Sequence, residues 1–208
     1  MKYEHLFRPI RLGSIELRNR IVFAPIGIGA YNPDETVNER YLPFIEARAR
    51  ETALLITQGS RPSALGGVKI IGSYDDRFIP GLRRFAEAAH RNGARFFLQL
   101  VVIGGNDPLG GFAPSVVDIP LYRDQWGRGQ EHRPKELSLE QIGQLVEDFA
   151  QAARRAREAG FDGVEVHGAY GYLISEFMTP ATNKRSDEYG GSFEKRMRFP
   201  VQIIRNIK

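Results

Sequence analysis

The sequence contains no cysteine among its 208 residues. This absence excludes disulfide bonds, thiolate metal ligands, iron–sulfur ligation and cysteine nucleophiles from the chain, and no metal site is expected. The N-terminus, Met1 to Pro9, lacks the apolar core of a secretory signal. No later stretch approaches the roughly 18 consecutive apolar residues that a membrane-spanning helix needs. We therefore expect a soluble, cytoplasmic protein without a membrane partner.

Long runs of a single charge are also missing. The formal net charge is +4, but the 29 Lys and Arg residues are dispersed among 25 Asp and Glu residues. Nucleic-acid binding requires basic residues that cluster, so the pattern favours a solvated surface and a small-molecule partner over nucleic acid. A hydrophobic content of 42% is ordinary for a folded globular chain and argues against disorder.

Four short apolar runs rich in β-branched and aromatic residues predict strands. They are Ile21 to Ala24, Ala53 to Thr57, Phe96 to Val102, and Val164 to His167. A helical pattern follows each run: residues 38–50, the segment after Pro80, the segment after Ser138, and residues 192–207. Strands that alternate with helices at this spacing predict parallel strands joined by right-handed crossovers, which is the α/β class.

Several local signals set the bounds of these elements. Ser138 and Gln141 form a capping-box pattern, and Gly160 provides a left-handed stop for the helix that follows. Pro200 is expected to bend the last helix. Apolar stripes are formed by Ile142, Leu145, Val146, Phe149 and Ala153, and by Leu82, Phe85, Ala86 and Ala89. Ile10 to Leu17, with Gly13-Ser14 at the centre, predicts a small hairpin that closes the bottom of a barrel.

The long connection from Ile103 to Lys135 is rich in Gly and Pro and carries Trp126. Connections of this length usually serve function, and in a barrel this one would lie on the face where ligands bind. We expect a lid or a substrate-contacting role. A disordered insertion is the alternative.

Two stretches near the end of the chain carry a family resemblance. The first, Gly160 to Pro180, reads Gly-Phe-Asp-Gly-Val-Glu-Val-His-Gly-Ala-Tyr-Gly-Tyr-Leu-Ile-Ser-Glu-Phe-Met-Thr-Pro, and the second is Asn183 to Ser192. They resemble the fourth strand and following loop of the old yellow enzyme family of flavin oxidoreductases, which also includes dienoyl-CoA reductases and trimethylamine dehydrogenase. Leu6 to Pro9, Leu17 to Val22 and Gln99-Leu100 support the match, which covers essentially the whole chain.

The resemblance implies a (β/α)8 barrel of the TIM type. Such a barrel has eight strand and helix units in about 250 residues. This chain supplies the first four, with the N-terminal hairpin, as one truncated domain over residues 1–208. A half-barrel leaves the outer strands unpaired, so we expect a longer parent protein, a second half-barrel or a homo-oligomer to complete it.

The resemblance also implies an FMN site. The residues that it places at the cofactor are Ala24, Pro25, Ile26, Gly27, Gly59, Gln99 and His167. Ile26 stands where the family commonly has methionine, and Gly27 where it often has threonine or cysteine. Gly59 keeps the backbone open to the flavin ring, and Gln99 is expected to bond its pyrimidine edge.

The implied catalytic residues are His167, Tyr170 and Tyr172. His167 matches the first member of the family's His-x-x-His or His-x-x-Asn pair, which grips the substrate carbonyl oxygen, and Tyr170 replaces the second member. Tyr172 matches the family's proton donor. The chain also departs from the family after Gln99-Leu100, where Val102 to Gly105 replaces a His-x-Gly-Arg pattern.

Taken alone, each of these residues has a plainer interpretation. A lone histidine at a strand end is usually structural, and the two tyrosines could be aromatic residues of a barrel rim. Glu165 shares the parity of His167, points inward, and should need a basic or amide partner because an unpaired buried carboxylate is costly. Asp187 to Ser192 is expected to cap a helix and fix its loop rather than contact a cofactor.

Three functions remain open from the sequence. The first is an FMN-dependent oxidoreductase that uses NAD(P)H to reduce activated carbon–carbon double bonds of enone or dienoyl type. The second is a non-catalytic, self-associating half-barrel that binds flavin weakly or not at all. The third is a phosphate-binding barrel without flavin, for which the motif match would have to be accidental.

Overall fold

The computed structural model describes residues 3–117 and 133–208. Trp126 and His132 lie outside the described residues. The chain divides into two compact units. The first unit comprises residues 1–60, 70–100 and 153–165, and the second unit comprises residues 61–69, 101–152 and 166–208. Each is described by itself, and a single domain over residues 1–208 stays a prediction.

A parallel sheet forms the centre of the first unit. Its order is β3 (Val22–Phe23), β4 (Leu54–Arg61), β6 (Arg95–Leu100) and β9 (Gly163–Val166), with the short β5 (Ile71–Gly72) paired to β4. β4 runs parallel to both β3 and β6. The four predicted strands are therefore confirmed, in chain order, although β3 is shorter than predicted, β4 continues to Arg61, and β6 ends at Leu100.

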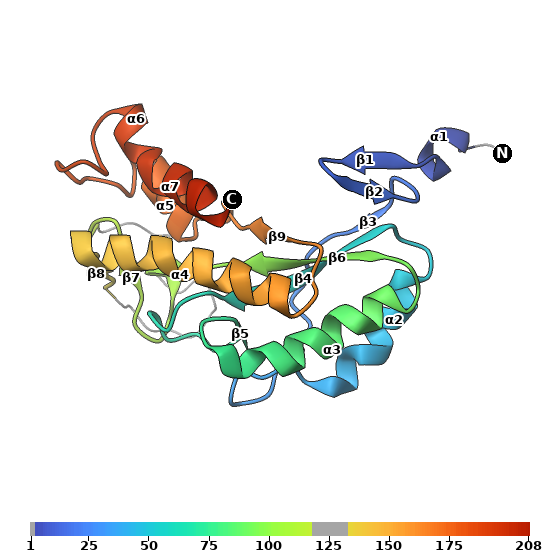
Figure 1. The fold of residues 1–208 in the computed structure, drawn as a ribbon. Helices are drawn as coiled ribbons and strands as arrows, with labels where there is room; N and C mark the ends of the chain where they lie inside the picture. Colours follow the sequence, from blue (N-terminus) through green and yellow to red (C-terminus); the bar gives the residue numbers. More distant parts are fainter. Residues whose placement is uncertain (1–2, 118–132) are drawn as a thin grey trace. The chain divides into compact units, whose positions relative to one another are not determined.

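Two helices lie along this sheet (Figure 1). α2 (Leu42–Ala49) follows the 3₁₀ turn η1 (Glu39–Tyr41), and α3 (Ile79–His90) follows η2 (Asp76–Phe78). α3 packs against both α2 and β6. The predicted stripe is confirmed, since Leu82, Phe85, Ala86 and Ala89 are each at most 1% exposed. Burial of each large apolar side chain contributes roughly 1.5–3 kcal/mol.

The predicted N-terminal hairpin is present and packs on the sheet. It follows α1 (Glu4–Phe7) and pairs β1 (Ile10–Leu12) antiparallel with β2 (Ile15–Leu17). Gly13 turns the chain at φ +59°, a left-handed conformation that costs other residues more than glycine. Ile15 and Leu17 contact Ala53 and Leu54. The hairpin thus covers the start of β4, the strand end expected at the bottom of a barrel.

The predicted capping box starts the long helix α4 (Leu139–Glu158). The Gln141 backbone N–H donates to Ser138 Oγ at 3.1 Å, and the Ser138 N–H donates to Gln141 Oε1 at 3.0 Å. Gly160 ends the segment at φ +93°. The apolar face is as predicted at Ile142, Leu145, Val146 and Phe149, but it continues through the buried Ala152, and Ala153 is half-buried.

The last predicted helix is interrupted. The second unit contains α5 (Leu173–Met178), then α6 (Phe193–Arg196) and α7 (Arg198–Ile207), with the break at Met197. Ser192 caps α6 by accepting a hydrogen bond from the Lys195 N–H. Proline lacks an N–H and its ring crowds the carbonyl four residues earlier, so Pro200 accounts for the break at Met197, whereas the bend stays a prediction.

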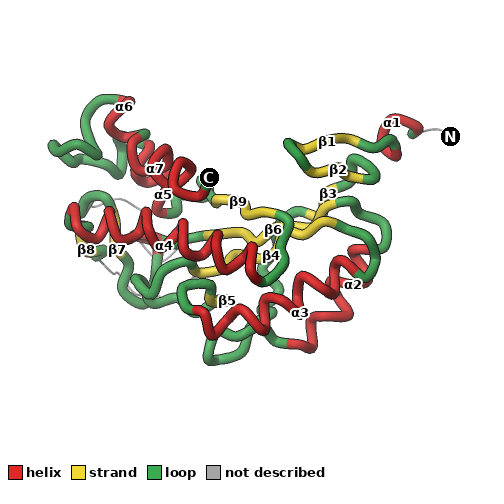
Figure 2. The backbone as a smooth tube through the Cα atoms, viewed as in Figure 1, coloured by secondary structure: helices red, strands yellow, loops and turns green. Residues whose placement is uncertain are grey.

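The described parts of the long connection carry regular structure that the sequence pattern did not predict. A 3₁₀ turn, η3 (Gly104–Asn106), is followed by β7 (Phe112–Ala113), which pairs parallel with β8 (Lys135–Glu136). Figure 2 labels β7 and β8 on the backbone tube. The two described ends of the connection are therefore held together by backbone hydrogen bonds.

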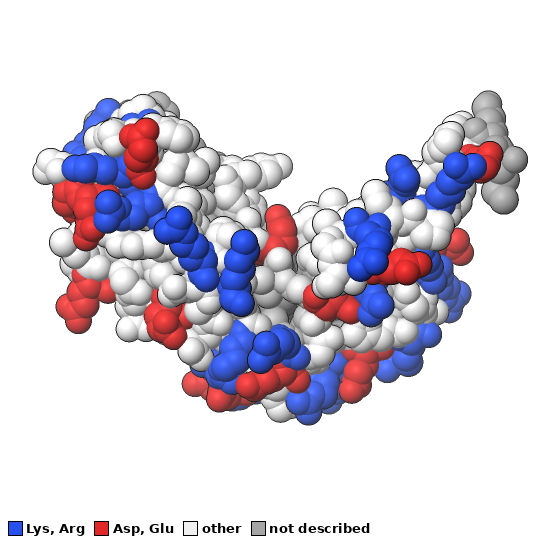
Figure 3. All heavy atoms as spheres, turned by 45° about the horizontal axis from the view of Figure 1, so that its top comes forward, with Lys and Arg blue, Asp and Glu red and all other residues white. Residues whose placement is uncertain are grey.

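Charged side chains of both signs are mixed on the surface. On the face drawn in Figure 3, Lys and Arg lie among Asp and Glu. Asp76, for example, binds both Arg154 and Arg155 at 2.6 Å, which lowers its pKa from the usual value. Within the described residues, no helix has the length and apolar character to cross a bilayer.

Candidate functional site

The predicted site residues fall into two groups. Ala24 to Gly27, Gly59 and Gln99 belong to the first unit, whereas His167, Tyr170 and Tyr172 belong to the second. The first group is called the platform and the second group the donor loop. Each is described within its own unit.

Gln99 is the most tightly held residue of the platform. Its backbone N–H donates to Thr57 Oγ1 at 2.9 Å, and its carbonyl accepts from Ser60 Oγ at 2.8 Å. It lies opposite Gly59, where the register between β4 and β6 shifts. The two residues that the sequence assigned to one cofactor edge are therefore neighbours on adjacent strands.

The side chain of Gln99 is fixed by Glu165. Gln99 Nε2 donates to Glu165 Oε2 at 2.7 Å, and Gln99 is 6% exposed. This confirms the prediction that Glu165 needs an amide or basic partner. A hydrogen bond to a charged group is typically worth about 1.5–3 kcal/mol. Because one hydrogen of the Gln99 side-chain amide is bonded to Glu165, the other amide hydrogen and the side-chain oxygen Oε1 keep a defined direction.

Gln58 fixes the backbone that follows the platform segment. Its Oε1 accepts hydrogen bonds from the N–H groups of Ile28 and Ala30, each at 3.1 Å. The preceding segment is open, since Ile26 is 53% exposed and a Cβ on Gly27 would meet nothing within 4 Å. Gln58 was not among the residues predicted from the sequence, although a glutamine within an apolar strand was a usable signal.

The tautomer of His167 follows from its backbone contact. The Ala169 N–H donates to His167 Nδ1 at 3.2 Å. In the neutral ring, the nitrogen that accepts carries no proton, so the proton lies on Nε2. His167 is half-buried. It therefore offers a single N–H donor with a defined direction.

The rings of the donor loop lie close together. The His167 ring centroid is 5.1 Å from that of Tyr172 and 6.1 Å from that of Tyr170, and the two phenol centroids are 6.3 Å apart. Tyr170 is 79% exposed and has a φ of +62°. A left-handed conformation costs a non-glycine residue roughly 1–2 kcal/mol, so the loop holds Tyr170 in an outward position at the expense of local strain.

The pKa of Tyr172 is raised above its usual value. Burial of the phenol is the main cause, and the neighbouring Tyr170 adds to it. An unperturbed tyrosine has a pKa of about 10. Tyr172 therefore remains protonated at neutral pH and can act as a proton donor.

Arg185 holds the loop that follows the donor loop, and the sequence analysis assigned it no role. It is 9% exposed and donates to the carbonyls of Pro114 and Leu137 at 2.8 and 2.7 Å. Asp187 accepts from Arg185 Nη2 at 2.6 Å, which lowers the pKa of Asp187. This confirms that the segment from Asp187 fixes its loop. Arg185 also ties that segment to Pro114, within the long connection, and to Leu137, just after it.

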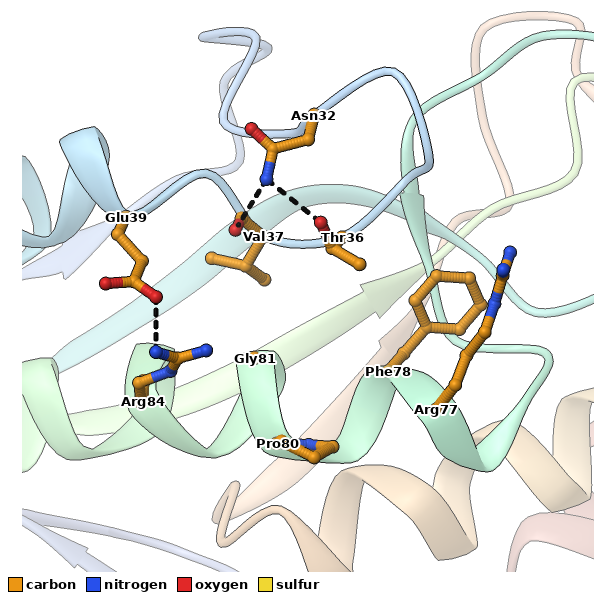
Figure 4. A pocket seen from close by; sticks show the side chains of 9 residues that line it. All are labelled: Asn32, Thr36, Val37, Glu39, Arg77, Phe78, Pro80, Gly81 and Arg84. Atoms are coloured by element: carbon orange, nitrogen blue, oxygen red, sulfur yellow. Dashed lines mark hydrogen bonds and ion pairs between the residues drawn. The ribbon is translucent and has the colours of Figure 1, made fainter.

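The first unit also contains a cavity of about 420 Å³. Its lining, shown in Figure 4, contains none of the predicted site residues. Glu39 pairs with Arg84, Asn32 donates to Thr36 Oγ1 at 2.9 Å, and the Arg77 guanidinium lies 4.6 Å from the Phe78 ring centroid. Glu39 and Arg84 are engaged with each other and Arg77 with Phe78, so we assign the cavity no role.

Comparisons with known proteins place the chain among flavin oxidoreductases. Residues 5–208 match the family described as NADH:flavin oxidoreductase / NADH oxidase. The chain is 39% identical over 216 residues to an NADH oxidase of Thermoanaerobacter brockii, covering 99% of this chain and 32% of that protein. It is 37% identical over 206 residues to 12-oxophytodienoate reductase 1 of Oryza sativa subsp. japonica, covering 96% of this chain and 54% of that protein.

A solved structure gives the same result for the fold. The old yellow enzyme homologue from Zymomonas mobilis superposes with a TM-score of 0.86 at 32% identity, over 97% of this chain and 59% of that one. The chain thus spans between about a third and three fifths of the length of these three proteins.

Proposed function

The chain belongs to the NADH:flavin oxidoreductase / NADH oxidase family, and from this premise we propose that it forms part of an FMN-dependent enzyme that uses NAD(P)H to reduce activated carbon–carbon double bonds. The fold agrees with the prediction: the chain provides the first four β/α units of a TIM barrel of the old yellow enzyme type, and the barrel is incomplete. The proposed acceptors are enones or dienoyl compounds.

The residues of the platform fit an isoalloxazine ring. A flat aromatic ring needs an apolar surface that is open, together with polar groups that meet its pyrimidine edge. Ile26 and Gly27 provide the open surface. Gln99, fixed by Glu165, provides an amide with a defined direction beside Gly59. When bound, FMN supplies hydride transfer between NAD(P)H and the acceptor.

The donor loop suits the other half of the reaction. When a hydride adds to the β-carbon of an enone, negative charge develops on the carbonyl oxygen, and a donor placed there lowers the barrier. His167 offers its Nε2–H because the Ala169 N–H occupies Nδ1. This contact is the observation that carries the proposal. The Tyr170 hydroxyl is the proposed second donor to the same oxygen.

Tyr172 is the proposed proton donor to the α-carbon. Its raised pKa keeps the proton on the phenol until the enolate forms. In the overall reaction, the acceptor gains a hydride and one proton, and NAD(P)H is oxidised to NAD(P)+. Tyr172 recovers its proton from water. Its phenol lies 5.1 Å, centroid to centroid, from the His167 ring, so both groups serve one substrate.

Absorbance spectroscopy of the purified protein tests this proposal. We expect flavin absorbance that bleaches on anaerobic addition of NADH or NADPH and returns when cyclohexenone is added. Bleached flavin that cyclohexenone fails to reoxidise would contradict the choice of acceptor. A colourless protein that takes up no added FMN would overturn the enzymatic proposal and favour the non-catalytic half-barrel.

A further inference from the structure

The segment after β6 is tied by hydrogen bonds to α5, the helix that follows the donor loop. This is the segment in which Val102 to Gly105 departs from the family's pattern. The Val102 carbonyl accepts from the Leu173 N–H at 3.1 Å. The Gly105 N–H donates to both carboxylate oxygens of Glu176, at 3.0 and 3.1 Å. Both contacts lie inside the second unit, so the departing segment is fixed against the start of α5.

Asn106 extends this contact to the donor loop itself. Its Nδ2 donates to the carbonyl oxygen of Gly171 at 2.7 Å. Gly171, at φ +71°, lies between Tyr170, at φ +62°, and Tyr172. Glycine adopts this conformation freely, whereas Tyr170 stays in it only where surrounding contacts hold it. The Asn106 side chain holds the carbonyl of the Gly171–Tyr172 peptide, and the N–H of that peptide donates to the Ala169 carbonyl at 3.2 Å.

The burial of Asn106 shows that a single atom of its side chain is used. Asn106 is 1% exposed, and within the described residues its Oδ1 has no hydrogen-bond partner. A buried acceptor without a partner is unfavourable. The Asn106 amide therefore makes its hydrogen bond to Gly171 while its buried acceptor carries a stability penalty.

We propose that Asn106 is a positioning residue that sets the directions of the Tyr170 and Tyr172 hydroxyls by holding the Gly171 carbonyl. It acts through the loop and contacts no reacting atom. The role rests on the proposed function, because the hydroxyls are the substrate donors. In this chain, Asn106 stands one residue beyond the segment that replaces the family's His-x-Gly-Arg.

Substitution of Asn106 by leucine tests the role. Asn106→Leu has a similar size and removes the unpaired acceptor together with the donor, so the cost of losing the hydrogen bond to Gly171 is partly offset. The loop should relax, and the affinity of the FMN-loaded protein for phenol should fall about tenfold, because small displacements of positioned groups have large effects. Ser115→Ala is the control: Ser115 Oγ accepts from the Lys184 N–H at 2.9 Å in the same unit, away from both tyrosines.

A readout without flavin separates this inference from the proposed function. The pKa of Tyr172 can be followed by NMR in protein labelled with ¹³C at tyrosine Cζ. In Asn106→Leu it should move down towards the ordinary value, because the contact with Tyr170 and the burial are both reduced. An unchanged Tyr172 titration would overturn the role of Asn106 whether or not FMN binds. Failure to bind FMN would instead overturn the proposed function.

A second variant keeps the test valid if Asn106→Leu fails to fold. In Asn106→Asp the protonated acid can still donate to the Gly171 carbonyl, whereas the carboxylate cannot. Phenol affinity in this variant should therefore fall about tenfold as the pH rises between about 5 and 8, a range set by the raised pKa of a buried carboxyl group. Phenol affinity at each pH is compared with that of the unmodified protein, so that pH effects common to both proteins cancel. A flat ratio between the two proteins would contradict the proposal.

Discussion

The two units hold their predicted functional residues in opposite ways. In the first unit, Gln99 is buried within a parallel sheet and is bonded through its backbone to β4 and through its side chain to Glu165 of β9. In the second unit, Tyr170 projects from a loop in a left-handed conformation and is 79% exposed. A flat ring requires a rigid surface, whereas substrate donors on a loop can differ between relatives without disturbing the sheet. The difference predicts that cofactor and substrate binding respond to separate substitutions.

The largest expected effect is on the donor loop. His167→Ala removes the N–H donor proposed for the substrate oxygen, and kcat/KM for cyclohexenone should fall by about 10²–10³-fold, as for the loss of an oxyanion donor. Steady-state kinetics measure this. Circular dichroism and FMN content should match the unmodified protein, and a loss of less than threefold would remove His167 from the site.

A substitution at Gly104 should show how rigidly the second unit supports its loop. A Cβ there would lie 2.5 Å from Glu176 Oε2, and Gly104 has a φ of +76°. Gly104→Ala should therefore lower the free energy of unfolding by about 2–4 kcal/mol through overpacking and backbone strain. Urea denaturation measures the change.

Gly191→Ala is the matched control for that substitution. Gly191 has a φ of +82° but nothing within 4 Å of a Cβ, so only backbone strain of about 1 kcal/mol is expected. Equal losses in the two variants would show that the packing of Gly104 against Glu176 is unimportant.

Glu165 provides the opposite test, on the platform. Glu165→Ala frees the Gln99 amide, and the FMN dissociation constant should rise about five- to tenfold, which corresponds to the loss of one hydrogen bond. Fluorescence titration with FMN measures it. Glu46→Ala, which removes a carboxylate paired with Arg91 in the same unit, should leave FMN affinity unchanged, and an equal effect in both variants would argue against a specific role for Glu165.

The smallest effect concerns the alkaline limb of the pH profile. The pKa of Tyr172 is raised, so this group favours the folded state fully below its unfolded pKa of about 10, and that contribution is lost as the pH rises through the higher folded pKa. The rate of catalysis should therefore decline only at a pH above the ordinary tyrosine pKa of about 10. Tyr170→Phe should shift the limb downward, though burial keeps it raised. If the alkaline limb does not move in Tyr170→Phe, Tyr170 does not contribute to the raised pKa of Tyr172.

The sequence predicted the elements that depend on local patterns. The four strands, the apolar stripe of α3 and the Ser138–Gln141 capping box all follow from residues within a few positions of one another. The break at Met197 was missed because the effect of Pro200 falls on the preceding turn. The pairing of β7 with β8 was missed because two-residue strands are too short to show an alternation of apolar and polar side chains.

The candidate site was predicted less completely, for a related reason. The family motif predicted Gln99 and the donor loop as site residues. The alternation of side chains along the strand, with the cost of an unpaired buried carboxylate, predicted a partner for Glu165. The hydrogen bond from Asn106 to Gly171 joins residues that are 65 positions apart, and that from Gly105 to Glu176 joins residues 71 positions apart. No local pattern relates such residues, because the fold brings them together.

A phenol titration of the FMN-loaded protein tests the separation of the two units most directly, with absorbance as the readout for FMN and for the long-wavelength band of a stacked phenolate. We expect His167→Ala to retain FMN and lose the phenol band, and Glu165→Ala to bind FMN more weakly while its FMN-bound fraction keeps the phenol affinity of the unmodified protein. If His167→Ala keeps the phenol band, or if both variants lose both ligands together, the division between a cofactor platform and a donor loop is wrong.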